Sequence, residues 1–268
     1  MTARWVLTAL LLPLIVALAL AQNGSRARRW EAYEHEMQHP AEDPPDAWEK
    51  TEFAFARLRF RSRYDGYRYG RSRWGTDANK SERQFIVGLR RLTRIHARSV
   101  EEIVDIESDE MFNWPWLYAV GIGDWTLSES HIARLRKFFG RGGTLMVDDF
   151  HNEREWGDFM AGIGRILPGH EVVELADGDQ IFGVVYDLKE RFHVPGRQVV
   201  GGQLWERGGV GHHYRAVLDT RGRVQVAICF NMDLGDAWEW ADDPLYPERY
   251  SSLAYRIGVN YITYAMTH

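Results

Sequence analysis

The chain has 268 residues, of which 45% are hydrophobic and 26% are charged, and this length allows one domain with a substantial core. Such a composition excludes an intrinsically disordered protein. The net charge is −5, and the only cysteine, Cys229, excludes an internal disulfide bond and is expected in a buried strand.

Residues 1–21 predict an export signal. An apolar run from Trp5 to Ala21 follows Arg4 and ends in a small-x-small sequence, as signal peptidase sites do. Paired arginines are absent from the basic region and no cysteine follows the run, so neither a twin-arginine nor a lipoprotein signal fits. We therefore expect an exported protein, periplasmic or secreted. The alternative is a membrane anchor at residues 5–21, although that run is shorter than the roughly 20 residues of a comfortable span.

Residues 22–50 are rich in charge and proline and predict a lead-in segment, whereas residues 51–268 predict a single α/β domain. Alternating residues from Glu52 to Arg61 indicate the first strand. The loop that follows is rich in arginine and aromatic residues, and it makes Arg68, Arg71 and Arg73 candidates for binding an anionic partner. In a cytosolic protein it would suggest single-stranded nucleic acid, but export argues against that. The alternatives are a loop packed on the acidic part of the chain and a surface for an anionic glycan, a lipid headgroup or a protein.

A helix is predicted after the loop, starting at a capping box formed by Ser81 and Gln84. Short apolar runs at 103–106 and 117–122 predict two strands. A second capping box, Thr126 with Glu129, begins the next predicted helix, which glycines end after Phe139.

The most informative stretch is Thr144–Val147, an apolar run typical of a strand covered on both faces, followed by Asp148, Asp149 and His151. In open α/β sheets ligands lie outside the carboxyl ends of the strands, which is where these three side chains fall. Adjacent strand residues point to opposite sides, so the two aspartates are not expected to act as one carboxylate pair. One is expected to face the crevice and the other to cap the next helix.

The remaining elements continue the pattern. Asn152 and Glu155 are expected to cap a helix that Pro168 ends; strands are predicted at 172–175 and 225–230 and a last helix at 252–266. Residues 231–240 are expected to form an acidic and aromatic loop, either a lid that pairs with Arg71 or Arg73 or a carbohydrate surface. Alternating strands and helices predict a three-layer α/β fold with a mostly parallel central sheet and helices on both faces.

Several segments together resemble the bacterial domain of unknown function 4159 family: Trp114–Tyr118, Leu135–Asp149, Asp233–Glu239 and Arg256–Tyr261. The resemblance extends from about Phe53 to the C terminus and implies a flavodoxin-like or class I glutamine amidotransferase-like fold. It implies no activity. The turn where an amidotransferase carries its cysteine has Asp148 and Asp149 here, so glutaminase chemistry is not expected. The His-Pro pair that the family tends to place before an Ile-Phe is replaced by Asp179-Gln180.

The predicted crevice gathers side chains from the ends of several strands. Its candidate ligand-binding residues are Asp77, Asp124, Asp148, Asp149, His151, Asp233, Asp236, Trp238 and Glu239. No catalytic residue is assigned. A divalent metal ion could also draw on His212 and His213, but no HExxH or CxxC spacing is present and the metal ligands stay undecided. Residues 208–213 are glycine-rich without nucleotide-binding spacing, so no cofactor is expected.

The preferred hypothesis is an exported, ligand- or partner-binding accessory protein of the cell envelope. The alternative is a carboxylate- or metal-dependent hydrolase acting on a glycan or an amide, with Asp148 or Asp149 as general base. Expected partners are an envelope protein or a small anionic or glycan ligand, with no nucleic acid. A third possibility is a scaffold that uses the arginine-rich loop.

Overall fold

The structure is a computed structural model that describes residues 43–63 and 73–268. The predicted export signal, most of the lead-in segment, Arg68 and Arg71 lie outside the described residues. Within the described ranges, no helix is both long and apolar enough to cross a membrane.

A seven-stranded sheet forms the centre of the molecule, in the order β3-β1-β4-β6-β9-β8-β7. The strands are β1 (Ala56–Arg59), β3 (Glu102–Asp105), β4 (Trp116–Val120), β6 (Thr144–Phe150), β7 (Val172–Glu174), β8 (His213–Leu218) and β9 (Val224–Phe230). The first five strands in this order are parallel, and β8 is antiparallel to both of its neighbours. The mostly parallel sheet is therefore confirmed, and the five parallel strands follow the 2-1-3-4-5 order of flavodoxin-like sheets.

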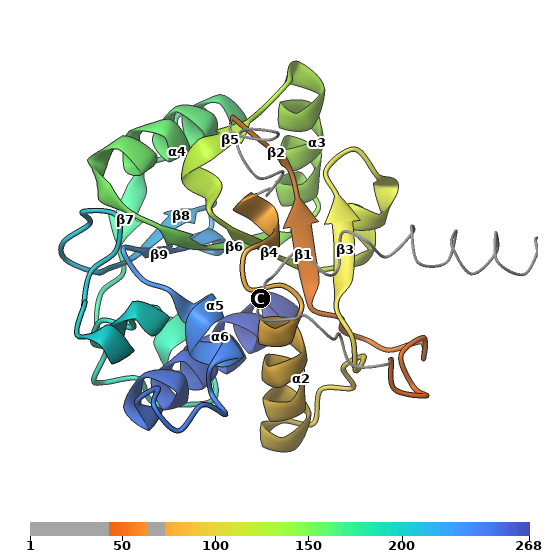
Figure 1. Cartoon of the computed structure of the whole chain (residues 1–268). Coiled ribbons are helices and arrows are strands. Elements are labelled where there is room, and N and C mark those ends of the chain that lie inside the picture. Colours follow the sequence, from red (N-terminus) through yellow and green to blue (C-terminus); the bar gives the residue numbers. More distant parts are fainter. Residues whose placement is uncertain (1–42, 64–72) are drawn as a thin grey trace, which may run out of the picture.

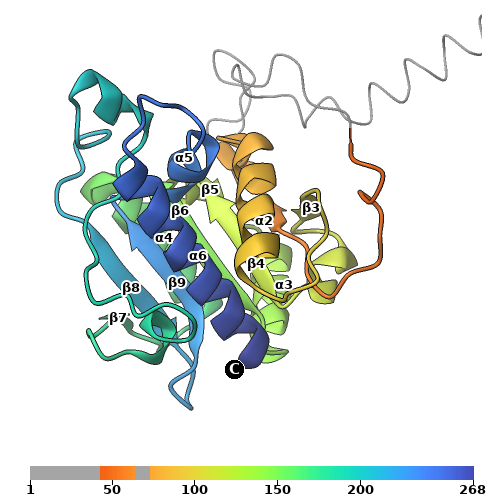
Figure 2. The same cartoon turned by 90° about the horizontal axis from the view of Figure 1, so that it is seen from below.

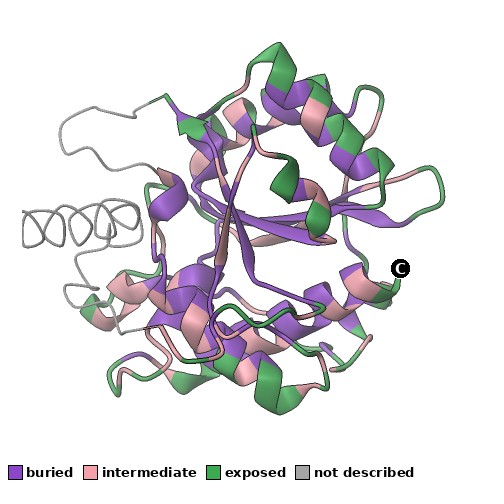
Figure 3. Cartoon of the chain, turned by 90° about the vertical axis from the view of Figure 1, so that its right-hand side faces the viewer, coloured by how far each residue is buried: buried purple, intermediate pink, exposed green. Residues whose placement is uncertain are grey.

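Helices cover both faces of this sheet, which confirms the three-layer prediction (Figures 1 and 2). One face carries α3 (Glu129–Gly140) and α4 (Asn152–Ile166); the other carries α2 (Lys80–Leu92), α5 (Leu234–Glu239) and α6 (Glu248–Thr267). Figure 3 shows the strands buried and the outer sides of the helices exposed. Each face buries its own apolar core against these helices.

Shorter elements connect the layers. Strands β2 (Arg61–Ser62) and β5 (Trp125–Thr126) pair antiparallel outside the main sheet. The 3-10 helices are η3 (Arg73–Gly75), η4 (Asp109–Asn113), η5 (Ile122–Asp124), η6 (Gln180–Phe182) and η7 (Arg197–Gly201).

Strand β6 lies in the middle of the sheet, between β4 and β9, and all seven of its residues are buried. Val147 packs in the α3 and α4 core, whereas Met146 packs in the opposite core. The register with β9 shifts between Val147 and Phe150, and Asp149 has a left-handed backbone with φ +49°. A positive φ is uncommon for a non-glycine residue, so the strand changes direction at the aspartate pair.

Two of the predicted helix caps are wrong. Helix α3 begins two residues later than expected, because Ser128 rather than Thr126 accepts from the backbone N–H of His131. Helix α2 has Asn79 at its N-cap, and Ser81 lies inside the helix with its hydroxyl between Arg57 and Glu82. The Ser81 hydroxyl hydrogen-bonds to the buried ion pair of Arg57 and Glu82 and therefore does not cap the helix.

The cap of α4 follows the prediction more closely. Asn152 Oδ1 accepts from the N–H groups of Arg154 and Glu155, and Glu155 Oε2 accepts from the N–H of His151. This reciprocal arrangement fixes the chain directly after β6.

The segment predicted as a loop at 231–240 contains helix α5, most of which is buried. Asp233 is its N-cap residue and accepts from the N–H of Asp236. Strand β8 was absent from the predicted elements. It follows the glycine-rich stretch at 208–211 and completes the sheet beside β9.

Candidate functional site

Asp148 connects the end of β6 to the start of α5. Its Oδ2 accepts from the hydroxyl of Tyr118 at 2.9 Å and from the N–H groups of Leu234 and Gly235 at 2.7 and 3.0 Å. Its Oδ1 is buried and has no hydrogen-bond partner among the described residues. Burial, followed by the charge of Asp149, raises the pKa of Asp148 to about 8. Asp148 therefore stabilises the start of α5 and not that of α4, where one of the two aspartates was expected.

Asp149 turns to different partners. Arg207 Nη2 lies 2.8 Å from Asp149 Oδ1 and 2.9 Å from its backbone oxygen, and His151 Nε2 lies 3.2 Å from the same Oδ1. Burial alone would raise the pKa of Asp149, but Arg207 and His151 outweigh it and hold that pKa below its usual range. The two neighbouring carboxyls are thus driven in opposite directions, as in sites that separate a proton donor from a charged carboxylate.

Three carboxylates from two segments meet at what we call the Asp233 centre, formed by Glu206, Asp233 and Asp236. One oxygen of each lies within 4.8 Å of the other two. A Cβ added at Gly196 would touch an oxygen of Glu206 and would lie 2.6 Å from Asp236 Oδ2 and 2.7 Å from Asp233 Oδ2. The three oxygens therefore converge beside a backbone position where a side chain would not fit.

The charges at this centre are only partly compensated. Within residues 43–63 and 73–268, no lysine or arginine side chain forms an ion pair with Asp233 or Asp236. Burial and the charge of Asp236 raise the pKa of Asp233 well above its usual value, and burial raises that of Asp236 to about 6. Two further groupings of three residues share a member with it: Asp149 and His151 with Glu206, and Asp77 and Glu239 with Asp236.

Two other predicted residues, Trp238 and Asp124, are not members of this centre. Trp238 is fully buried against Phe55, Phe85 and Tyr118, so its indole is part of the core. Asp124 pairs with Arg154 at 3.1 Å on the α4 side of the sheet.

Arg73, one of the residues expected to bind an anionic partner, lies 3.7 Å from Asp124 and 3.4 Å from Glu155. The predicted pairing of Arg73 with the 231–240 segment is not among its contacts with the described residues.

Neither His212 nor His213 belongs to the three groupings of possible metal ligands described above. His213 Nδ1 faces Glu174 at 3.2 Å on the edge strands, and His212 packs near His193 with ring centroids 5.9 Å apart. The metal ligand set that included these two histidines is therefore not brought together.

Sequence reasoning missed Glu206, Arg207 and the pairing role of Glu155. Glu206 and Arg207 lie between η7 and β8, in a segment without periodicity, and Arg207 has φ +46°. The sequence feature that could have identified these two residues is an acid directly beside an arginine in a glycine-rich stretch.

A family model described as "Domain of unknown function (DUF4159)" matches residues 55–266. The matched range includes every residue of the site. No curated protein matches the chain.

Proposed function

The chain belongs to the DUF4159 family, whose description assigns no activity, and we propose that it is a ligand-binding domain that takes a hard divalent cation, such as Ca²⁺ or Mg²⁺, at the Asp233 centre. The carrying observation is the convergence of Glu206, Asp233 and Asp236 beside Gly196. Hard divalent cations prefer carboxylate and carbonyl oxygens.

The electrostatics of the centre support this proposal. Burial and repulsion from neighbouring carboxylates raise the pKa values of Asp233 and Asp236, and this repulsion lowers the stability of the fold at neutral pH. A divalent ion removes this repulsion by replacing the retained protons. We therefore expect cation affinity to increase as the pH rises through about 6, where Asp236 ionises.

A thermal-unfolding titration with CaCl2, MgCl2 and MnCl2 tests the proposal. A cation present at 100 times its Kd adds about 2.7 kcal/mol to the free energy of unfolding. Asp233→Asn and Asp236→Asn should remove this gain. The matched control is Asp187→Asn, because Asp187 is 66% exposed in its side chain and its ion-pair partner among the described residues is the exposed Lys189. Equal shifts in all four proteins would contradict the proposal.

A second candidate function is the hydrolase, acting on a glycan or an amide. It is favoured by the opposed pKa shifts of Asp148 and Asp149, because such pairs divide acid and base roles. In this reading Asp149 stays charged as the base and Asp148 stays protonated. For any glycan or amide that the protein hydrolyses, Asp149→Asn should then abolish the hydrolysis. Cation binding to the Asp233 centre should persist in this variant.

Both functions are proposed in an exported setting. Residues 1–21 carry the features of a secretory signal, and the accessory role in the cell envelope is proposed together with export. N-terminal sequencing of the protein recovered from cell fractions tests this. Recovery of a chain that begins after Ala21 in the periplasm or medium agrees with cleavage, whereas an intact chain in the membrane fraction supports the anchor at residues 5–21.

A further inference from the structure

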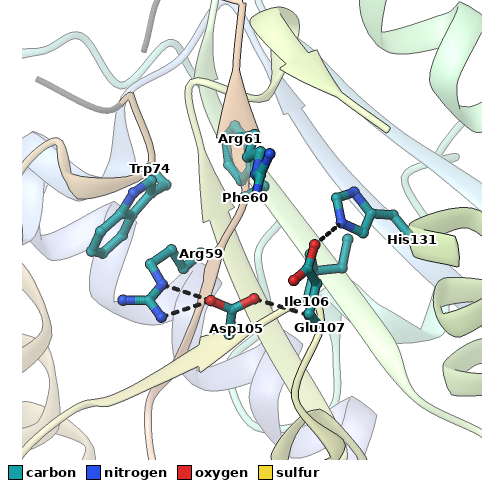
Figure 4. A pocket seen from close by; sticks show the side chains of 8 residues that line it. All are labelled: Arg59, Phe60, Arg61, Trp74, Asp105, Ile106, Glu107 and His131. Carbon is teal, nitrogen blue, oxygen red and sulfur yellow. Dashed lines mark hydrogen bonds and ion pairs between the residues drawn. The ribbon is translucent and has the colours of Figure 1, made fainter. Parts of the chain in front are cut away.

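A cavity of about 240 Å³ lies at the carboxyl ends of β1 and β3 (Figure 4). Trp74, Phe60 and Ile106 contribute its apolar walls, and each of these residues is less than 5% exposed. A second cavity of about 270 Å³ shares Arg61 and His131 with the first, together with Glu107. The two hollows therefore meet at one set of polar side chains.

Both acids of the first cavity have a partner among the residues that line it. Arg59 binds Asp105 through two nitrogens, at 3.0 and 2.6 Å from Oδ2. His131 Nε2 lies 2.9 Å from Glu107 Oε1. Figure 4 shows both contacts, with Trp74 and His131 on opposite sides of the pocket.

Arg61 differs from these side chains. Its backbone is held in β2, where it pairs with Thr126, and Thr126 Oγ1 donates to its carbonyl at 3.1 Å. The residue as a whole is exposed, and no carboxylate of the described residues forms an ion pair with its guanidinium. Among the described residues, the cavity thus has one arginine without a carboxylate partner beside an apolar wall.

We propose that this cavity binds a small planar carboxylate, with the carboxylate on Arg61 and the planar body against Trp74 and Phe60. The guanidinium fork matches a carboxylate with two parallel hydrogen bonds, which gives orientation as well as attraction. Glu107 and Asp105 disfavour a second negative charge, so the ligand is a monoanion. This site is separate from the Asp233 centre, and neither proposal depends on the other.

Three isosteric probes test the charge requirement: benzoate, benzamide and benzamidinium, which are anionic, neutral and cationic. In NMR titrations of the chain, benzoate should bind about tenfold more tightly than benzamide, because a charge-assisted bond contributes more than a neutral one. Benzamidinium should bind most weakly. Equal affinities for the three probes would overturn the proposal.

Variants of Arg61 test the position of the site. Arg61→Gln should weaken benzoate binding about tenfold and leave benzamide binding unchanged. Arg61→Lys should retain part of the affinity, because the ammonium keeps the charge without the fork. The control is Arg221→Gln, at a β-turn, whose side chain is 81% exposed. If Arg61→Gln binds benzoate as the unmodified chain does, the ligand sits elsewhere and the assignment is wrong.

Discussion

The guanidinium of Arg207 lies 2.8 Å from the carboxylate of Asp149, although 58 positions of sequence separate the two residues. Arg207 also lies 3.4 Å from Glu155. A single arginine from an irregular segment thus compensates two carboxylates at the end of the central strand, one on β6 and one on α4.

Replacing Arg207 by methionine should lower the free energy of unfolding by about 3 to 5 kcal/mol, because Asp149 would remain buried without its main counter-ion. Arg207→Lys should lose less, since an ammonium keeps the charge but cannot contact both carboxylates. Urea unfolding of the two variants checks this order. A loss below about 1 kcal/mol for Arg207→Met would place the pair among surface ion pairs.

Gly196→Ala should weaken divalent-cation binding by at least about tenfold. Gly196 has φ −70°, so alanine fits the backbone, but its Cβ would meet all three carboxylates of the Asp233 centre. Calorimetric titration with CaCl2 measures the effect. Gly201→Ala is the matched control, since a Cβ there has nothing within 4 Å, and it should bind like the unmodified chain.

Asp148→Asn should flatten the pH dependence of stability. The folded-state pKa of Asp148 is raised from 3.8 to about 8, so between these values the unfolded chain releases a proton that the folded chain retains. The stability present at low pH is therefore lost as the pH rises through this window, by about 1.4 kcal/mol per pH unit.

An asparagine does not titrate, so the stability of Asp148→Asn relative to the unmodified chain should increase between pH 5 and 7. Denaturation in EDTA-containing buffers measures this difference without bound cations. A constant difference across that range would mean that Asp148 titrates near its ordinary pKa.

Arg57 should be needed for the stability of the segment that leads to Asp77. Its side chain is fully buried, pairs with Glu82, and donates to the carbonyl oxygens of Trp74 and Thr76 at 2.9 and 2.8 Å. Arg57→Met should cost about 3 to 5 kcal/mol because Glu82 is left as an unpaired buried charge. The double variant with Glu82→Leu should be more stable than Arg57→Met alone, which denaturant midpoints would reveal.

Most strands of the main sheet and the aspartate pair were predictable because their signals are local, whereas β8 was missed. The apolar run at Thr144–Val147 predicted β6, and the position of Asp148, Asp149 and His151 followed from its end. The last helix was also found, although it begins at Glu248. Each of these features depends on residues that are neighbours in sequence.

The missed features depend on tertiary contacts. Ser81 looked like a cap, but the buried pair of Arg57 and Glu82 takes its hydroxyl. Glu206 and Arg207 have no periodic neighbours, and only folding brings them to β6 and α5. The charge balance of the site was therefore not visible from spacing alone.

Cys229 lies on β9, beside β6, and is fully buried. Burial, together with the charge of Asp148, raises the pKa of its thiol well above the usual value. Because it is the only thiol in the chain, alkylation with a maleimide measures how often the centre of the sheet opens to solvent, without mutagenesis or an added label.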